Sequence, residues 1–315
     1  MNLLKLSPNN QKQLYNYKNT FLSITKLYEN KKLPNKILFT GSKGIGKATL
    51  SYHLINYIFS KNEDFKYDIN KYQINQLNRS YKLIINNSHP NFNLINVLEG
   101  KKIIEISQIR QMINYTNKSS FNNRERIILI DNVENLNLNS LNALLKIVEE
   151  PNENVFFILV FDNSKKLLNT LKSRCLRFNL SMTFNESVSI VNKIIQEDIY
   201  NLINPDLINY YCTPGDFINL INFSSVAKFD LTKLDLKKFL VNLIDEKYYK
   251  KNNFIKNNIY KYIEFYFLNL MNLKYSRNKI NSYYSEFIQK IYDLKKFNLD
   301  EESFFIELKT KILNG

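Results

Sequence analysis

Three short runs of almost unbroken apolar residues constrain the fold of this chain most strongly. They cover residues 37–39, 127–130 and 155–161, and polar residues do not alternate with apolar ones inside them. A strand of this composition needs cover on both faces, which is typical of a parallel sheet between two layers of helices. Helical stretches are predicted between these strands, at 47–60, 105–116 and 138–149. The sequence therefore predicts an α/β fold with a doubly wound parallel sheet.

The pattern changes after residue 180. Strand signals fade there, and amphipathic helical patterns continue to the end, with breaks near Thr213-Pro214-Gly215 and near Phe229-Asp230. A chain of 315 residues is longer than one ordinary compact domain. We therefore expect three domains: a sheet-containing domain over 1–180, a small helical domain over 181–228 and a C-terminal helical domain over 229–315.

Composition narrows the classes of protein to which the chain can belong. Two cysteines and two histidines occur, with no C-x-x-C or H-x-x-x-H spacing, so we expect neither a disulfide framework nor a zinc site. No apolar run approaches the roughly 20 residues needed to span a bilayer, and the N-terminus lacks the apolar region of a secretory signal. We expect no membrane partner and a cytoplasmic location. The net charge of +15 favours an anionic partner.

A phosphate-binding motif follows the first apolar run. Residues 41–47 read G-S-K-G-I-G-K, with Gly41, Gly44, Gly46 and Lys47 in the spacing of a P-loop. In such loops the glycines let backbone amides curl around phosphate oxygens, the following helix adds its positive end, and the lysine reaches the outer phosphates. We expect this loop to be the remnant of a nucleotide site.

Two residues needed for hydrolysis are missing around this loop. Ala48 stands where a working loop has Ser or Thr to hold magnesium, and Thr49 is rotated from that position by about 100° on a helix. Asp131 ends the second apolar run, where a carboxylate could sit beside the metal. The next residue, however, is Asn132, and an amide is a poor general base. The sequence predicts no intrinsic ATPase activity, no required cofactor and degenerate or absent ATP binding.

Together with three further motifs, these residues resemble the delta-prime subunits of the bacterial DNA polymerase III clamp loader, which are AAA+ proteins. The motifs are Ser88-His89-Pro90, Leu141–Lys146 running into Glu149-Glu150-Pro151, and Ser173-Arg174-Cys175. They occur in the family's order between residues 36 and 178. Residues 181–315 resemble the family only in helical character and length.

The resemblance implies an AAA+ P-loop domain, a helical lid and a C-terminal collar that joins sibling subunits. It also implies that Arg174 acts in trans, in the ATP site of a neighbouring subunit, where its guanidinium neutralises charge on the transferred phosphoryl. Such arginines contribute about 10³ to 10⁵ in rate. Only seven of the 44 basic residues are arginines. The implied partners are the gamma/tau and delta subunits, the sliding clamp and, through the complex, primed DNA.

The chain also departs from the family pattern. Pro214-Gly215-Asp216 stands where hydrolysing relatives have Gly followed by Arg, and Asp216 has the wrong charge for a phosphate sensor. The four-cysteine zinc module that often follows the P-loop helix has no counterpart, since no cysteine lies between Lys47 and Arg174.

Three alternatives stay open at this point. The chain could be an active gamma/tau-like ATPase with an unusual metal ligand such as Thr49. It could instead be a DNA-binding protein in its own right, as its charge suggests. Arg174 could simply cap the helix that precedes it.

Overall fold

The computed structural model describes residues 6–117, 124–149, 154–165, 169–209, 211–272, 277–297 and 299–313. The chain divides into two compact units. Unit 1 comprises Met1–Ile190 together with Thr213–Gly215, and unit 2 comprises Val191–Cys212 and Asp216–Gly315. The finer division into three domains, with boundaries at 180 and 228, stays a prediction. Of the motif Glu149-Glu150-Pro151, only Glu149 belongs to the described residues.

A parallel sheet forms the centre of unit 1. Its strands are β1 (Lys36–Gly41), β2 (Phe92–Ile95), β3 (Arg126–Ile130), β4 (Val155–Asp162) and β5 (Leu176–Asn179), in the spatial order β2-β3-β4-β1-β5. All four neighbouring pairs are parallel. The three predicted strands are confirmed as β1, β3 and β4, which occupy the middle of the sheet. The edge strands β2 and β5 are short and only partly buried, so they lack the continuous apolar signal.

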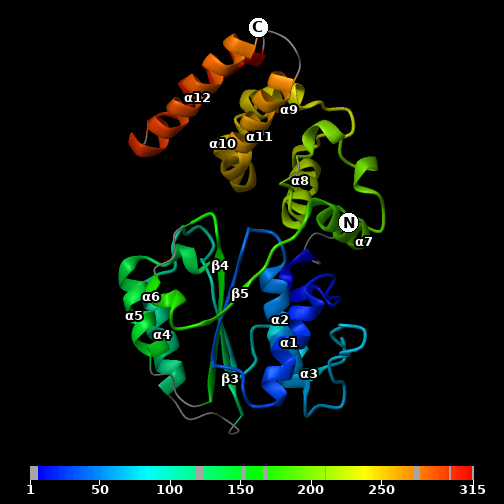
Figure 1. Ribbon diagram of the computed structural model, residues 1–315, viewed down its shortest axis with the longest axis vertical. Coiled ribbons are helices and arrows are strands. Elements are labelled where there is room, and N and C mark those ends of the chain that lie inside the picture. Colours follow the sequence, from blue (N-terminus) through cyan, green and yellow to red (C-terminus); the bar gives the residue numbers. More distant parts are fainter. Residues whose placement is uncertain are drawn as a thin grey trace. The chain divides into compact units, whose positions relative to one another are not determined.

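Helices cover both faces of the sheet (Figure 1). One layer contains α1 (Lys18–Glu29), α2 (Lys47–Ser60) and α3 (Arg79–Ile85), and the other contains α4 (Ile106–Asn117), α5 (Leu138–Glu149) and α6 (Asn169–Lys172). The helices predicted at 47–60, 105–116 and 138–149 are therefore confirmed. The α/β class with a parallel sheet followed by helices is confirmed as well.

The two layers explain why the central strands are apolar throughout. On β3, Ile127 and Leu129 belong to the core beneath α1, α2 and α3. Their neighbours Ile128 and Ile130 belong to the core on the opposite face, beneath α4 and α5. Because side chains alternate between faces along a strand, burial on both sides requires apolar residues at every position.

The polar stretch from Lys61 to Asn87, for which the sequence has no clear helical or strand pattern, is folded onto unit 1. Tyr67 and Ile74 reach the core beneath α2, and α3 forms its last part. A carboxylate organises it: Glu63 accepts hydrogen bonds from Asn78 Nδ2 at 2.6 Å and from Ser80 Oγ. Buried polar side chains paired in this way hold a segment that has few apolar residues of its own.

Unit 2 is helical in its described part. Its elements are the end of α7 (Phe184–Ile195), two 3-10 helices (Ile199–Asn201 and Pro205–Leu207), α8 (Pro214–Ala227) from Asp216 onward, α9 (Leu236–Asp245), α10 (Tyr248–Lys251), α11 (Asn253–Asn272), α12 (Arg277–Phe297), α13 (Glu301–Leu308) and a π-helical segment (Lys309–Leu313). Aromatic contacts fill its core, including Tyr249 against Phe305 with ring centroids 4.2 Å apart. No helix in the described ranges is long and apolar enough to cross a membrane.

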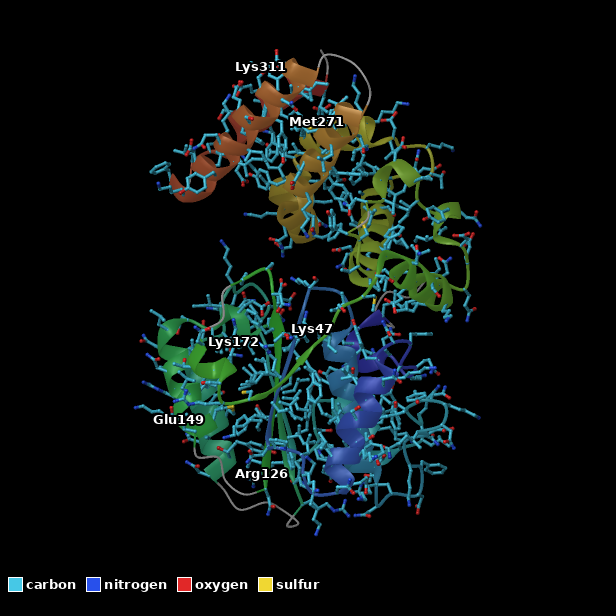
Figure 2. The ribbon with its side chains drawn as sticks, in the orientation of Figure 1. Lys47, Arg126, Glu149, Lys172, Met271 and Lys311 are labelled. Atoms are coloured by element: carbon cyan, nitrogen blue, oxygen red, sulfur yellow. The ribbon has the colours of Figure 1, made fainter. Side chains whose placement is uncertain are left out.

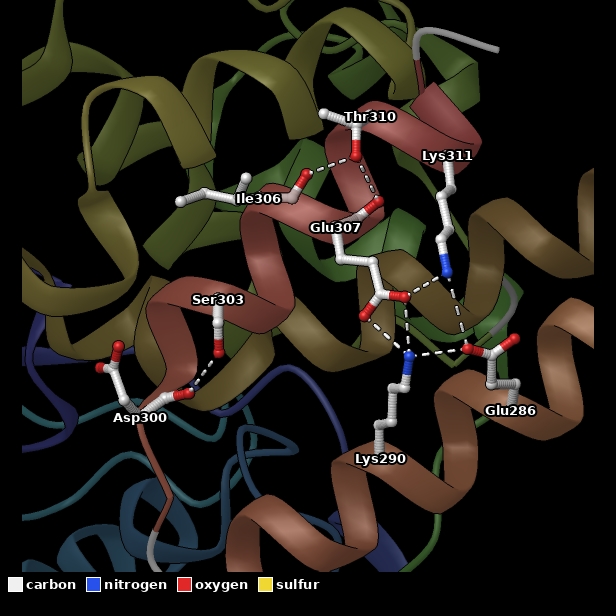
Figure 3. A network of polar contacts seen from close by, with 8 residues as sticks. All are labelled: Glu286, Lys290, Asp300, Ser303, Ile306, Glu307, Thr310 and Lys311. Atoms are coloured by element: carbon white, nitrogen blue, oxygen red, sulfur yellow. Dashed lines mark hydrogen bonds and ion pairs between the residues drawn. The ribbon is translucent and has the colours of Figure 1, made fainter.

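An ionic network joins the C-terminal segment to α12 (Figure 3). The Lys290 ammonium lies 2.6 Å from Glu286 Oε1 and 2.7 Å from Glu307 Oε2. Lys311 pairs with Glu307 and lies 3.9 Å from Glu286 Oε1. The side chains are partly exposed, so the network positions the chain end more than it stabilises the unit.

Candidate functional site: a closed phosphate loop and a remote arginine

The candidate phosphate loop lies between β1 and α2, as its sequence predicts. The strand ends at Gly41 and the helix begins at Lys47. Gly44 and Gly46 have φ values of 85° and 95°, which residues with a side chain rarely adopt. The two glycines therefore allow the chain to turn from the carboxyl end of the strand directly into the helix.

Lys47 turns back onto its own loop. Its side chain is buried, with 6% of the residue exposed. The Nζ atom donates hydrogen bonds to the Gly41 carbonyl at 2.8 Å and to the Ser42 carbonyl at 2.6 Å. The ammonium group expected to reach outer phosphates is thus satisfied by loop carbonyls.

Three carboxylates surround Lys47. Burial lowers the pKa of Lys47, whereas the negative charges of Asp162, Glu134 and Asp131 act in the opposite direction, in that order of importance. Burial raises the pKa of Asp131, and the Asn132 amide and the nearby lysines partly offset that effect. Lys47 and these three carboxylates, all of one chain, form what we call the acidic pocket.

Asn132 and Glu134 have roles of their own in this pocket. Asn132, at φ 58°, donates from its backbone to Asp131 Oδ1 at 2.9 Å and from Nδ2 to Asn96 Oδ1 at 2.8 Å. A short 3-10 helix (Val133–Asn135) then brings Glu134 back, so that it accepts a hydrogen bond from the Asp162 amide at 3.1 Å. Glu134 lies in the same cluster as Lys47. Its position in the sequence relative to Asp131 does not by itself predict this.

Residues 213–215 cover the loop. The Gly215 amide donates to the Gly44 carbonyl at 3.0 Å. A Cβ atom placed on Gly44 would lie 2.3 Å from Thr213 Oγ1, and one placed on Gly215 would lie 2.7 Å from Gly44 Cα. Backbone is thus packed directly against backbone at the middle of the loop. No room remains for a side chain at Gly44.

These residues do not fit a hydrolysing magnesium–nucleotide site. Ala48 offers no oxygen to a metal, Asn132 is no general base, and the carbonyl of Gly44 is already bonded. Within the described ranges, no group of three or more His, Cys, Asp or Glu side chains is placed to hold a metal ion.

Arg174 lies at the other end of the sheet from Lys47. It precedes β5, which pairs in parallel with β1 in the register Ile37 to Leu176. Arg174 is therefore at the amino ends of the strands, whereas the loop is at their carboxyl ends. Figure 2 shows Lys47 and Glu149, the partner of Arg174, in separate parts of unit 1. Arg174 does not serve the pocket of its own chain.

The Arg174 guanidinium is held by two groups of its own chain. Nη2 lies 2.7 Å from Glu149 Oε1 at the end of α5, and Nη1 donates to the Thr170 carbonyl in α6 at 2.7 Å. The second contact is the helix cap that the alternative interpretation expected. The side chain is nevertheless 34% exposed. Burial raises the pKa of the adjacent Cys175 thiol to about 11, so this motif contains no reactive thiolate.

The predicted site residues lie together at one end of the sheet: Gly41, Gly44, Gly46, Lys47 and Asp131. Asp162 and the covering residues were not predicted as site residues, and neither was Glu134, whose place two residues after Asn132 did not require it to face the site. Asp162 had a usable signal, because it ends the central strand next to β1, and the carboxyl ends of neighbouring parallel strands meet at one edge. The cover by Thr213 and Gly215 had only an indirect signal, because the resemblance places a nucleotide sensor at Pro214-Gly215-Asp216. The contact with Gly44 itself was not predicted, since these residues are distant from the loop in the sequence.

Comparison with known proteins identifies relatives among DNA polymerase III subunits. A family model described as "DNA polymerase III, delta subunit" matches residues 17–183. The DNA polymerase III subunit delta' of Buchnera aphidicola subsp. Schizaphis graminum is 30% identical over 58% of this chain and 54% of its own. The subunit gamma of the same organism is 28% identical over 63% of this chain and 49% of its own. The chain thus spans about half the length of these relatives.

Among solved structures, a DNA polymerase III gamma subunit-related protein from Thermotoga maritima matches 92% of this chain and 97% of its own, with a TM-score of 0.48 and 16% identity. The family match begins at the start of α1 and ends after β5, so it contains the loop, the acidic pocket and Arg174. Since it covers more than half of the chain, the protein belongs to the DNA polymerase III delta subunit family, as its resemblance to delta-prime subunits predicted.

Proposed function

We propose that the chain is a non-hydrolysing subunit of a DNA polymerase III clamp loader, and that Arg174 completes the ATP site of a neighbouring subunit. Its partners are gamma/tau-type and delta subunits, the sliding clamp and, through the complex, primed DNA. The observation that carries the proposal is the chemistry around Lys47. The lysine is bonded to loop carbonyls, and Ala48 supplies no metal ligand. The subunit requires neither ATP nor zinc of its own.

The position of Arg174 supports the second part of the proposal. The residue is partly exposed, and its guanidinium is planar and permanently charged, as a site for phosphate oxygens requires. Its own loop lies at the opposite end of the sheet, so Arg174 does not reach a phosphate bound there, and the phosphate that the proposal assigns to it belongs to another chain. A surface ion pair such as the one with Glu149 contributes only about 0–1 kcal/mol, which makes exchange for a phosphate inexpensive.

Substitution of Arg174 in a complex reconstituted with the gamma/tau and delta subunits tests this role. Arg174→Ala should lower the DNA-stimulated ATPase rate by about tenfold or more, because charge on the transferred phosphoryl is no longer neutralised. Assembly, measured by size-exclusion chromatography, should be unchanged.

Arg177→Ala is the matched control. Arg177 is an exposed arginine on β5, three residues along the chain, and its loss removes the same charge. The control should retain the wild-type rate. Equal rates for Arg174→Ala and Arg177→Ala would refute the trans role of Arg174.

The alternative of an active ATPase is tested on the purified chain alone. We expect no turnover of Mg-ATP above that of a Lys47→Ala variant. Turnover that Lys47→Ala abolishes would favour the active enzyme and a metal ligand other than Ser or Thr at position 48.

A further inference from the structure

The cover over the loop is attached to the start of a long helix. Pro214 is the first residue of α8 and has no amide proton. The next amide, that of Gly215, is one of the groups at a helix start that lack a partner inside the helix. It donates to the Gly44 carbonyl at 3.0 Å. The helix start and the loop therefore satisfy each other.

Only glycine permits this contact on both sides. With a side chain at position 215, the Cβ would lie 2.7 Å from Gly44 Cα and 3.2 Å from the Gly44 carbonyl oxygen. Both of these are backbone atoms, which cannot swing aside as the end of a flexible side chain can. Thr213 Oγ1 also lies against Gly44, and Thr213 is itself buried, with 8% exposed.

We propose that Thr213–Gly215 is an autoinhibitory plug, which keeps the Gly41–Lys47 loop closed to triphosphates until it is displaced. The proposal deepens the proposed function and rests on it in one respect: the loop belongs to a subunit that does not turn ATP over. What it adds is that the loop has kept the backbone of a triphosphate site. Binding is prevented by a contact of the same chain, in addition to the replacement of the metal ligand by Ala48 and of the base by Asn132.

The chemistry of the loop supports this distinction. The absence of a metal ligand and a base removes hydrolysis, but it does not remove the glycine turn, the amides or the ammonium that recognise phosphate. Lys47 is held by two carbonyls of the loop itself, and these bonds can be exchanged for phosphate oxygens without unfolding the helix. The Gly215–Gly44 contact, in contrast, has to separate.

Weakening the plug tests the proposal on the full-length chain. In Gly215→Ala the added methyl group must push the plug off the loop, and Thr213→Ala removes the side chain that closes on Gly44 without adding atoms. The affinity for a fluorescent ATP analogue, measured by anisotropy without magnesium, should rise about tenfold or more in either variant. Inorganic triphosphate should compete, and Lys47→Ala in the opened protein should abolish the gain.

Ser225→Ala, on an exposed position of the same helix α8, is the matched control and should bind as weakly as the wild type. Amide exchange at position 215 in Thr213→Ala reports whether the plug has opened, and circular dichroism reports whether the fold is kept. A folded variant with fast exchange at position 215 and no gain in affinity would overturn the proposal. Tight binding of triphosphate by the wild type, with the Gly215 amide still protected from exchange, would overturn the proposal as well.

The outcome is independent of the test of Arg174. If the plug variants gain no affinity for triphosphate, the trans role of Arg174 still stands, because that role is measured in the ATP site of a neighbour. Conversely, an Arg174→Ala complex with full activity would refute the proposed function and still allow Gly215→Ala to open the loop.

Discussion

Arg174 Nη2 lies 2.7 Å from Glu149 Oε1, at the amino ends of the strands, while Lys47 lies at their carboxyl ends. The two basic residues that the sequence singles out are thereby separated by the length of the sheet. One of them is held inside a closed pocket and the other is partly exposed. This separation underlies the predictions for Arg174 and Lys47.

Glu149 should restrain Arg174 without being required for folding. Glu149→Gln removes the charge that competes with a phosphate for the guanidinium, so the ATPase rate of a reconstituted complex should be equal to or higher than that of the wild type. Stability in urea should change by less than about 1 kcal/mol, because the pair is partly exposed. A loss of activity as large as that of Arg174→Ala would show that Glu149 has to hold the arginine in place.

Lys47 should contribute to stability, since it neutralises carboxylates of its own chain. Lys47→Met removes two hydrogen bonds and the positive charge that acts on Asp162, Glu134 and Asp131. The free energy of unfolding in urea should fall by about 1–3 kcal/mol. Lys43→Met, at an exposed lysine of the same loop, should have little effect. Equal stabilities of the two variants would contradict a structural role for Lys47.

His53 should make the protein less stable in mild acid. Burial lowers its pKa to about 4, and the ring is bonded to Tyr67 Oη at 2.8 Å and to the Gln11 carbonyl at 3.1 Å. The unfolded chain takes up a proton near pH 6.5 and the folded chain only near pH 4. Stability is therefore complete above pH 6.5 and is lost as the pH falls from 6.5 towards 4.

The expected loss from His53 between pH 6.5 and pH 5 is about 2 kcal/mol, at 1.36 kcal/mol per pKa unit. Urea unfolding at several pH values measures it. His53→Gln retains a donor and an acceptor but does not titrate, so its stability should depend less on pH in this window. If the free energy of unfolding changed equally with pH in the wild type and in the variant, His53 would be excluded as the source of the loss.

Glu307 should hold the C-terminal segment against α12. Glu307→Gln weakens the contacts with both Lys290 and Lys311 that Figure 3 shows. Amide exchange in 309–313 should become faster, while global stability changes by less than about 1 kcal/mol. Salt should have a similar effect on the wild type, because exposed ion pairs are screened. Glu246→Gln, which removes an exposed charge from the end of α9, should leave exchange in this segment unchanged.

Much of the fold could be predicted from local sequence patterns. The central strands β1, β3 and β4 are buried on both faces and carry continuous apolar runs, so they were recognised without any knowledge of their neighbours. The edge strands β2 and β5 were not, because strands exposed on one side have no such run. The fold of 61–87 could not be predicted either, because it depends on polar contacts such as those of Glu63, for which the sequence has no periodic signal.

The candidate site divides in the same way. The sequence by itself determined the glycine loop, the absence of a metal ligand at Ala48 and of a base at Asn132, and the presence of an arginine in the motif Ser173-Arg174-Cys175. These are properties of residue type and short spacing, and they do not depend on how the chain folds.

Only the tertiary structure decided that Gly215 closes the loop at Gly44, that Asp162 and Glu134 share the pocket of Lys47, and that Arg174 is paired with Glu149. Each of these contacts joins residues that are at least 25 positions apart in the sequence. These residues meet only because the chain folds. Such contacts arise from the order of parallel strands and the packing of helices on them, which no local pattern records.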